Sequence, residues 1–87
     1  MGYIHLGENQ MIPMEELIAI INIEDKMMPD TADFKDQAEA SKHFYPVSQT
    51  MPAKSLVIGA RGVYESPISS ATLYRRALNK IWEEKNE

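Results

Sequence analysis

Four basic side chains in the second half of the chain are the residues best suited to binding chemistry. Ammonium and guanidinium groups bind phosphate oxygens, and an arginine can do so through two parallel hydrogen bonds. If the fold brings them together, they form a surface that contacts the phosphates of a nucleic acid. The candidate nucleic-acid-binding residues are Lys54, Arg61, Arg75 and Arg76.

The charge of this region differs from that of the rest of the chain. The formal net charge is -4. Residues 1–40 hold two basic against nine acidic side chains, a balance of -7, whereas residues 41–82 hold six basic against one acidic, a balance of +5. Such a basic region either binds an external anion or complements the chain's own acidic half, within one molecule or between subunits. Charge alone leaves both alternatives open.

The sequence offers no recognisable catalytic or metal-binding motif. His5 and His43 are the only imidazoles and lie far apart, and the chain has no Cys. The run 59–62 lacks the length and the lysine of a phosphate-binding loop. The aspartates at 30, 33 and 36 lack the spacing of a calcium loop. We therefore expect a non-enzymatic protein with no cofactor, no metal and no small-molecule substrate.

The length of the chain bounds its organisation. Its 87 residues predict one domain over 1–87, and a domain of this size buries a thin core, which favours self-association. The apolar run Leu17–Ile23 is too short to span a membrane. The absence of Cys, of a secretion signal and of a myristoylation signal predicts a cytoplasmic protein.

The elements that must position the basic residues follow from hydrophobic patterning. The β-favouring residues 3–6 and 11–12 flank a turn and predict a hairpin, and Leu17–Ile23, apolar on both alternating faces, predicts a covered central strand. Thr31–Lys42 predicts a surface helix, the least stable element, and Tyr45–Ala53, with its two prolines, predicts a loop.

The remaining elements carry the basic residues. Lys54–Ala60 predicts a strand, and the tight turn after it makes a hairpin with Arg61 at its tip. Ser69 or Ser70 can cap a helix that runs to about Glu84. On that helix one face is mostly basic, and the opposite arc is apolar, with residues 73, 74, 77, 78 and 81. The sequence predicts an α+β fold with a small β-sheet core, a surface helix and a C-terminal amphipathic helix.

Three segments resemble a known family. They are Tyr3-Ile4-His5-Leu6-Gly7, Ala53-Lys54-Ser55, and the stretch from Val63-Tyr64-Glu65 through Ser66-Pro67-Ile68-Ser69-Ser70-Ala71-Thr72-Leu73 to Arg75-Arg76-Ala77. Together they resemble the RemA/RemB family of extracellular matrix regulators, over most of the chain. Residues 25–52 match least.

This resemblance implies a function and an assembly. RemA-like proteins are bacterial transcriptional regulators of biofilm matrix genes, with a LytTR-like fold, and they form rings that engage DNA through repeated basic residues. It implies that this chain is a homo-oligomeric DNA-binding regulator, with DNA and further copies of itself as partners.

One departure keeps an alternative open. Met51 and Pro52 stand where RemA-like proteins carry an arginine pair, and Glu16 stands at a further basic position, so that Lys54 is the remaining cation of that loop. The alternative is a protein-interaction or assembly module without DNA binding, whose basic half meets an acidic surface. Target sequence, stoichiometry and regulatory partners do not follow from the sequence.

Overall fold

The computed structural model describes residues 2–24 and 29–85, with the backbone alone for residues 83–85. A single 3₁₀ turn, Met14–Glu16, links two of the strands. The other elements in chain order are β1 (Tyr3–Gly7), β2 (Gln10–Pro13), β3 (Leu17–Asn22), α1 (Pro29–Ala40), β4 (Phe44–Pro46), β5 (Ser55–Gly59), β6 (Gly62–Ser66) and α2 (Ser70–Lys85). The predicted α+β class is confirmed.

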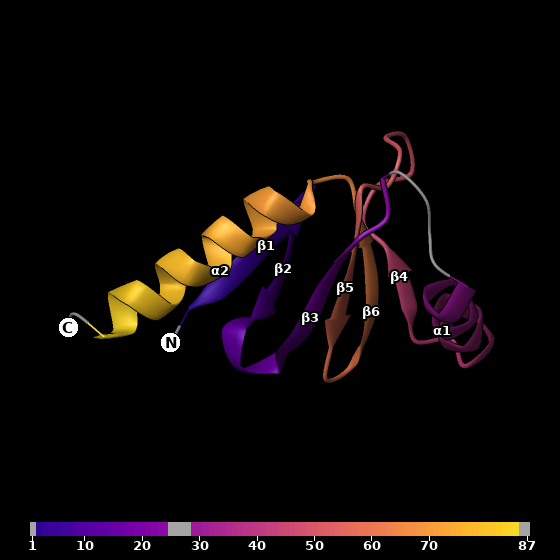
Figure 1. Cartoon of the computed structure of the whole chain (residues 1–87), viewed down its shortest axis with the longest axis horizontal. Helices are drawn as coiled ribbons and strands as arrows, with labels where there is room; N and C mark the ends of the chain where they lie inside the picture. Colours follow the sequence, from indigo (N-terminus) through magenta and orange to yellow (C-terminus); the bar gives the residue numbers. More distant parts are fainter. Residues whose placement is uncertain (1, 25–28, 86–87) are drawn as a thin grey trace.

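A four-stranded sheet in the order β3-β5-β6-β4 forms the middle of the molecule. The β1–β2 hairpin and α2 lie on one side of it, and α1 lies at the opposite end of the long axis (Figure 1). The principal extents are 40 × 24 × 24 Å. The two helices therefore mark opposite ends of an elongated molecule.

Two apolar clusters hold these layers together. The larger cluster joins the hairpin and α2 to the sheet, and it includes Leu6, Ile20, Val57 and Leu73. The smaller cluster joins α1 to the other side of the sheet through Ala38, Leu56 and Val63, with Ile21 packed against it. Each side of the sheet thus has its own small core.

The position of β3 corrects the prediction of a central strand. β3 pairs only with β5 among the described residues and forms an edge of the sheet. Its alternating side chains still meet apolar partners on both sides, because Ile20 belongs to the larger cluster and Ile21 packs against the smaller one. Hydrophobic alternation reports which faces of a strand are covered, and it does not report how many strands flank it.

The predicted loop over 45–53 is wrong at its start. Phe44–Pro46 forms β4, which pairs in parallel with β6 at the other edge of the sheet. Pro46 is the last residue of this edge strand, where a missing N–H is tolerated. The short parallel pairing depends on a partner far along the chain, which local patterning does not reveal.

The two helices lie close to their predicted ranges. α1 covers Pro29–Ala40, starting two residues before the predicted Thr31 and ending two before Lys42. Ala38 is its one buried residue, so it is a surface helix as expected. α2 begins at Ser70, and the Ser69 hydroxyl accepts a hydrogen bond from the backbone N–H of Thr72 at 3.3 Å. Ser69 is therefore the helix cap.

The apolar arc predicted for α2 is only partly buried. Leu73 and Ala77 are buried against the hairpin and the sheet. Four apolar side chains of the helix remain exposed: Tyr74, Leu78, Ile81 and Trp82. The small sheet and hairpin supply too little surface to cover a helix of this length (Figure 1).

Candidate nucleic-acid interface

Arg61 occupies the tip of the β5–β6 hairpin, as the sequence predicts. Its side chain is 81% exposed, and its Nε lies 3.3 Å from the Glu16 carboxylate. The Glu16 carbonyl also accepts a hydrogen bond from the Ala60 N–H at 2.8 Å, which holds the hairpin tip beside the 3₁₀ turn. The ion pair is solvent-exposed on the arginine side and is worth little to stability.

Lys54 lies at the other end of β5, just before the strand begins. Its backbone N–H donates to the Ser66 carbonyl at 2.8 Å, and its carbonyl accepts from the Ile23 N–H at 3.1 Å. The side chain is exposed and forms no ion pair with another described residue. The backbone is fixed, while the ammonium group remains available to an external anion.

Arg75 and Arg76 lie in the second turn of α2 and differ in their surroundings. Arg76 donates from Nη1 to the His5 carbonyl at 2.8 Å, which ties the helix to β1. Arg75 is exposed and pairs with no carboxylate within residues 2–24 and 29–82, where side chains are described. Arg75 therefore offers a free guanidinium, whereas Arg76 also has a structural role.

The structure places Lys54 and the start of α2, the helix that carries Arg75 and Arg76, at the same end of the β5–β6 hairpin. Lys54 is paired with Ser66, four residues before α2 begins. Arg61 lies beyond the opposite end of β5, separated by five strand residues, roughly 17 Å. One chain does not gather all four cations into one patch.

The acidic helix α1 lies away from α2, the helix that carries Arg75 and Arg76. α1 carries Asp30, Asp33, Asp36 and Glu39, all exposed, at the end of the molecule opposite α2 (Figure 1). Its one basic residue, Lys35, pairs with Glu65 of β6 at 2.7 Å and lies 5.4 Å from the centre of the Phe44 ring. The Glu65 hydrogen bond raises the pKa of Lys35 above 10.5, although burial opposes this shift.

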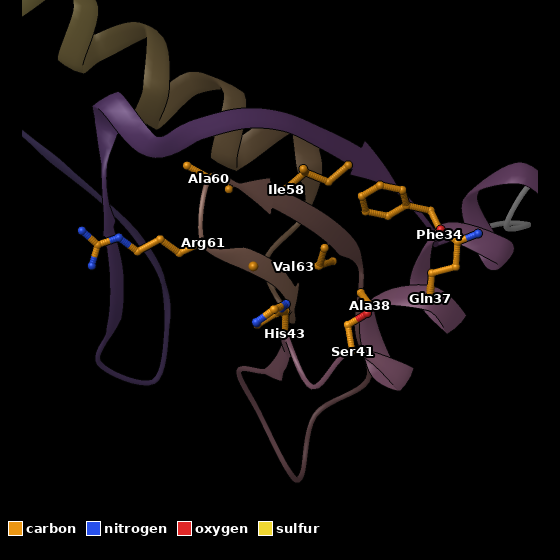
Figure 2. A pocket seen from close by; sticks show the side chains of 11 residues that line it. Phe34, Gln37, Ala38, Ser41, His43, Ile58, Ala60, Arg61 and Val63 are labelled. Atoms are coloured by element: carbon orange, nitrogen blue, oxygen red, sulfur yellow. The ribbon is translucent and has the colours of Figure 1, made fainter.

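An open pocket of about 550 Å³ lies between α1 and the β5–β6 hairpin (Figure 2). Phe34 and Ala38 line it from the helix, and Ile58 and Val63 line it from the sheet. His43 and Arg61 stand at its polar side. Sequence patterning missed this pocket, because α1 ends at Ala40 and the hairpin does not begin until Ser55, so their contact is not local in the chain.

Two negative findings apply to the described part of the chain. No three His, Asp or Glu side chains there converge in a way that would hold a metal ion. None of the helices there combines the length and the apolar character needed to cross a membrane.

Comparison with known proteins identifies the relatives of this chain. No protein-family model matches it. Extracellular matrix regulatory protein B of Bacillus subtilis strain 168 is 32% identical over 75 residues, which are 86% of this chain and 89% of that protein. The resemblance drawn from the three sequence segments is thereby confirmed. Since the similarity spans nearly all of both chains, this chain belongs to the family of extracellular matrix regulatory protein B.

Proposed function

We propose that this chain is a non-enzymatic, DNA-binding transcriptional regulator of extracellular matrix genes, acting in the cytoplasm as a homo-oligomer. The observation that carries the proposal is the relationship to extracellular matrix regulatory protein B over 86% of the chain, since that name states a regulatory role. Lys54 and Arg75, which are exposed and form no ion pair with another described residue, support DNA as the ligand.

The four cations have different parts in this proposal. Lys54 and Arg75 are the primary phosphate contacts, because neither must give up an ion pair to bind. Arg76 uses one N–H group on the His5 carbonyl and keeps others for a phosphate. Arg61 forms an ion pair with Glu16, and the negative charge of this carboxylate weakens any contact between Arg61 and a phosphate.

Oligomerisation supplies the affinity that a single subunit lacks. One chain carries a net charge of -4 and presents only a few free cations. Linked copies bind at high effective concentration once the first is engaged, so several weak sites act as one strong site. The same assembly would repeat the Lys54 and Arg75 contacts along the DNA backbone.

The salt dependence of duplex DNA binding tests the proposal. The logarithm of the affinity falls linearly with the logarithm of the salt concentration, and each phosphate contact steepens this fall by about 0.9, because counterions are released from the DNA. Arg75→Gln should reduce this slope by about one for each subunit engaged. Lys42→Gln removes an equal charge near the end of α1 and should leave the slope unchanged. Absence of DNA retention at low salt would reject DNA binding.

A second candidate is an assembly module whose partner is protein. The Arg61–Glu16 pair favours it, because it shows one predicted phosphate contact already neutralised by a carboxylate of the same chain. A pull-down from cell extract discriminates the two functions. Enrichment of a specific protein without any DNA would make this candidate the better account, whereas enrichment of specific genomic fragments would support the regulator.

A further inference from the structure

The open pocket of about 550 Å³ between α1 and the β5–β6 hairpin has the size of a small-molecule site. Sites that enclose small ligands usually measure about 300–1,000 Å³. α1 lines the pocket with positions 34, 37, 38 and 41, a spacing that keeps side chains on one face of a helix. Residues 58–63 of the hairpin supply the other wall. The proposed function leaves the cavity itself without a role.

One end of this pocket is apolar. Figure 2 shows Phe34 and Ile58 there, toward α1. Phe34 is 42% exposed and Ile58 is half-buried, and neither side chain belongs to either apolar cluster of the described residues. A ligand with an apolar body would bury surface here that the chain leaves in contact with water, which favours binding.

The other end of the pocket carries nitrogen donors. Figure 2 shows Arg61 and His43 there, at the end away from Phe34. The His43 carbonyl accepts a hydrogen bond from the Val63 N–H at 2.8 Å, which fixes the His43 backbone beside the hairpin. Among the described residues that line the pocket, none is Asp or Glu. The pocket therefore suits a ligand whose apolar body ends in an anionic group.

Arg61 already binds a carboxylate in this structure. Its Nε lies 3.3 Å from the carboxylate of Glu16, which is not part of the pocket lining. The Arg61 side chain is 81% exposed, so turning from Glu16 to a ligand costs little, because an exposed ion pair is worth little. A planar guanidinium can also bind a carboxylate through two parallel hydrogen bonds. Arg61 is thus suited to hold the anionic group of a ligand.

We infer that the pocket between α1 and the hairpin binds a small organic acid, with an apolar chain or ring against Phe34 and Ile58 and one carboxylate at Arg61. The polar side chains of Gln37, Ser41 and His43 also line the pocket and can donate further hydrogen bonds to the ligand. The inference goes beyond the proposed function, because it requires neither DNA nor a second copy of the chain.

Amide NMR spectra of the full chain, titrated with octanoate and with phenylpropionate, test this inference. Both probes join an apolar body to a carboxylate, so saturable shifts should appear at residues 34–41 and 58–63. Octanol lacks the charge and acetate lacks the chain, so each should bind at least about tenfold more weakly than octanoate. The inference would be overturned by shifts that never saturate with either acid in the millimolar range, by shifts centred on another surface, or by equal affinities for octanoate and octanol.

Substitutions at the anionic end test the contact with the carboxylate. Arg61→Gln should weaken octanoate binding by about tenfold or more, because it removes a charged hydrogen-bond donor, and should leave octanol binding unchanged. Arg75→Gln removes an equal charge outside the pocket and should leave the octanoate affinity unchanged. Glu16→Gln removes the competing carboxylate and should tighten octanoate binding. Equal octanoate affinities in Arg61→Gln and the wild type would overturn the inference.

A substitution at the apolar end tests the contact with the ligand body. Phe34→Ala should weaken octanoate and octanol binding alike, because both lose the same apolar contact. Ile18→Ala is the control, since Ile18 is 66% exposed on β3 and lies outside the pocket lining. Circular dichroism should show an unchanged fold in Phe34→Ala and Arg61→Gln, because both side chains are exposed. Octanoate binding that is unchanged in Phe34→Ala, or equally weakened in Ile18→Ala, would contradict the assignment of the site to this pocket.

Discussion

The Ser66 hydroxyl donates a hydrogen bond of 2.7 Å to the Leu6 carbonyl, which joins the end of β6 to β1 across sixty residues of chain. Both residues are fully buried. The same hydroxyl accepts from the Ile68 N–H at 3.1 Å, and the Ser55 hydroxyl donates to the Ile68 carbonyl at 2.7 Å. The serine-rich stretch that carries the family resemblance is therefore a structural junction between hairpin, sheet and α2.

Replacement of Ser66 should destabilise the fold at this junction. Ser66→Ala removes the donor to Leu6 and the acceptor of Ile68 in a buried site, which should cost about 1–3 kcal/mol. Urea denaturation should show a lower midpoint with an unchanged slope. Ser41→Ala, at an exposed position, should shift stability by less than about 0.5 kcal/mol. Equal urea midpoints for Ser66→Ala and Ser41→Ala would show that the buried hydrogen bonds of Ser66 do not stabilise the fold.

The Lys35–Glu65 pair should make stability depend on alkaline pH. The raised pKa of Lys35 means that the folded state favours its charged form. The contribution is therefore fully present below the ordinary lysine pKa of 10.5, and it is lost as the pH rises through the raised folded value. Lys35→Met should be less stable by about 1–2 kcal/mol at pH 7, and this difference should shrink above pH 10.5.

The neighbouring carboxylate provides the control for this pair. Glu39 lies 4.0 Å from the Lys35 ammonium and is 49% exposed, so Glu39→Gln should cost at most a few tenths of a kcal/mol. Urea unfolding of wild type and both variants across the alkaline range measures the effect. A Lys35→Met difference that is constant with pH would show that the methionine acts through packing and not through charge.

Gly62 should not tolerate a side chain, because β4 passes too close. A Cβ at Gly62 would lie 2.8 Å from the His43 carbonyl oxygen and 2.5 Å from the Tyr45 ring. Gly62→Ala should therefore destabilise the protein by about 1–3 kcal/mol in thermal or urea unfolding. Gly59→Ala is the matched control at the other side of the same turn, since its nearest contacts would lie at 3.5 Å. A control that lost more stability than Gly62→Ala would refute this account.

Glu16→Gln should strengthen DNA binding with little effect on folding. The change removes the carboxylate beside Arg61 and frees that guanidinium for a phosphate. Because the pair is exposed on the arginine side, unfolding free energy should change by less than about 1 kcal/mol. The salt slope of duplex binding should rise, whereas Glu15→Gln, at an exposed position with no pair to Arg61, should raise it less. Unchanged binding in Glu16→Gln would remove Arg61 from the phosphate contacts.

The sequence by itself determined the local elements and the identity of the basic residues. Period-two and period-3.6 apolar patterns, the Ser69 cap and the turn at Arg61 specify both hairpins, β3 and both helices, because these signals act over a few neighbouring residues. The same residues gave the family resemblance. Local signals also placed Arg61 at a hairpin tip and Arg75 on an exposed helix side, as the structure has them.

Only the tertiary structure decided which elements meet. It made β3 an edge strand and added β4 beside β6. It paired Arg61 with Glu16 and left Leu78 exposed. Each of these outcomes depends on contacts between segments distant in the chain, and the free energy of such contacts comes from the area that two surfaces bury together. A local pattern shows that a face is apolar, but the shape of the whole fold decides whether anything covers it.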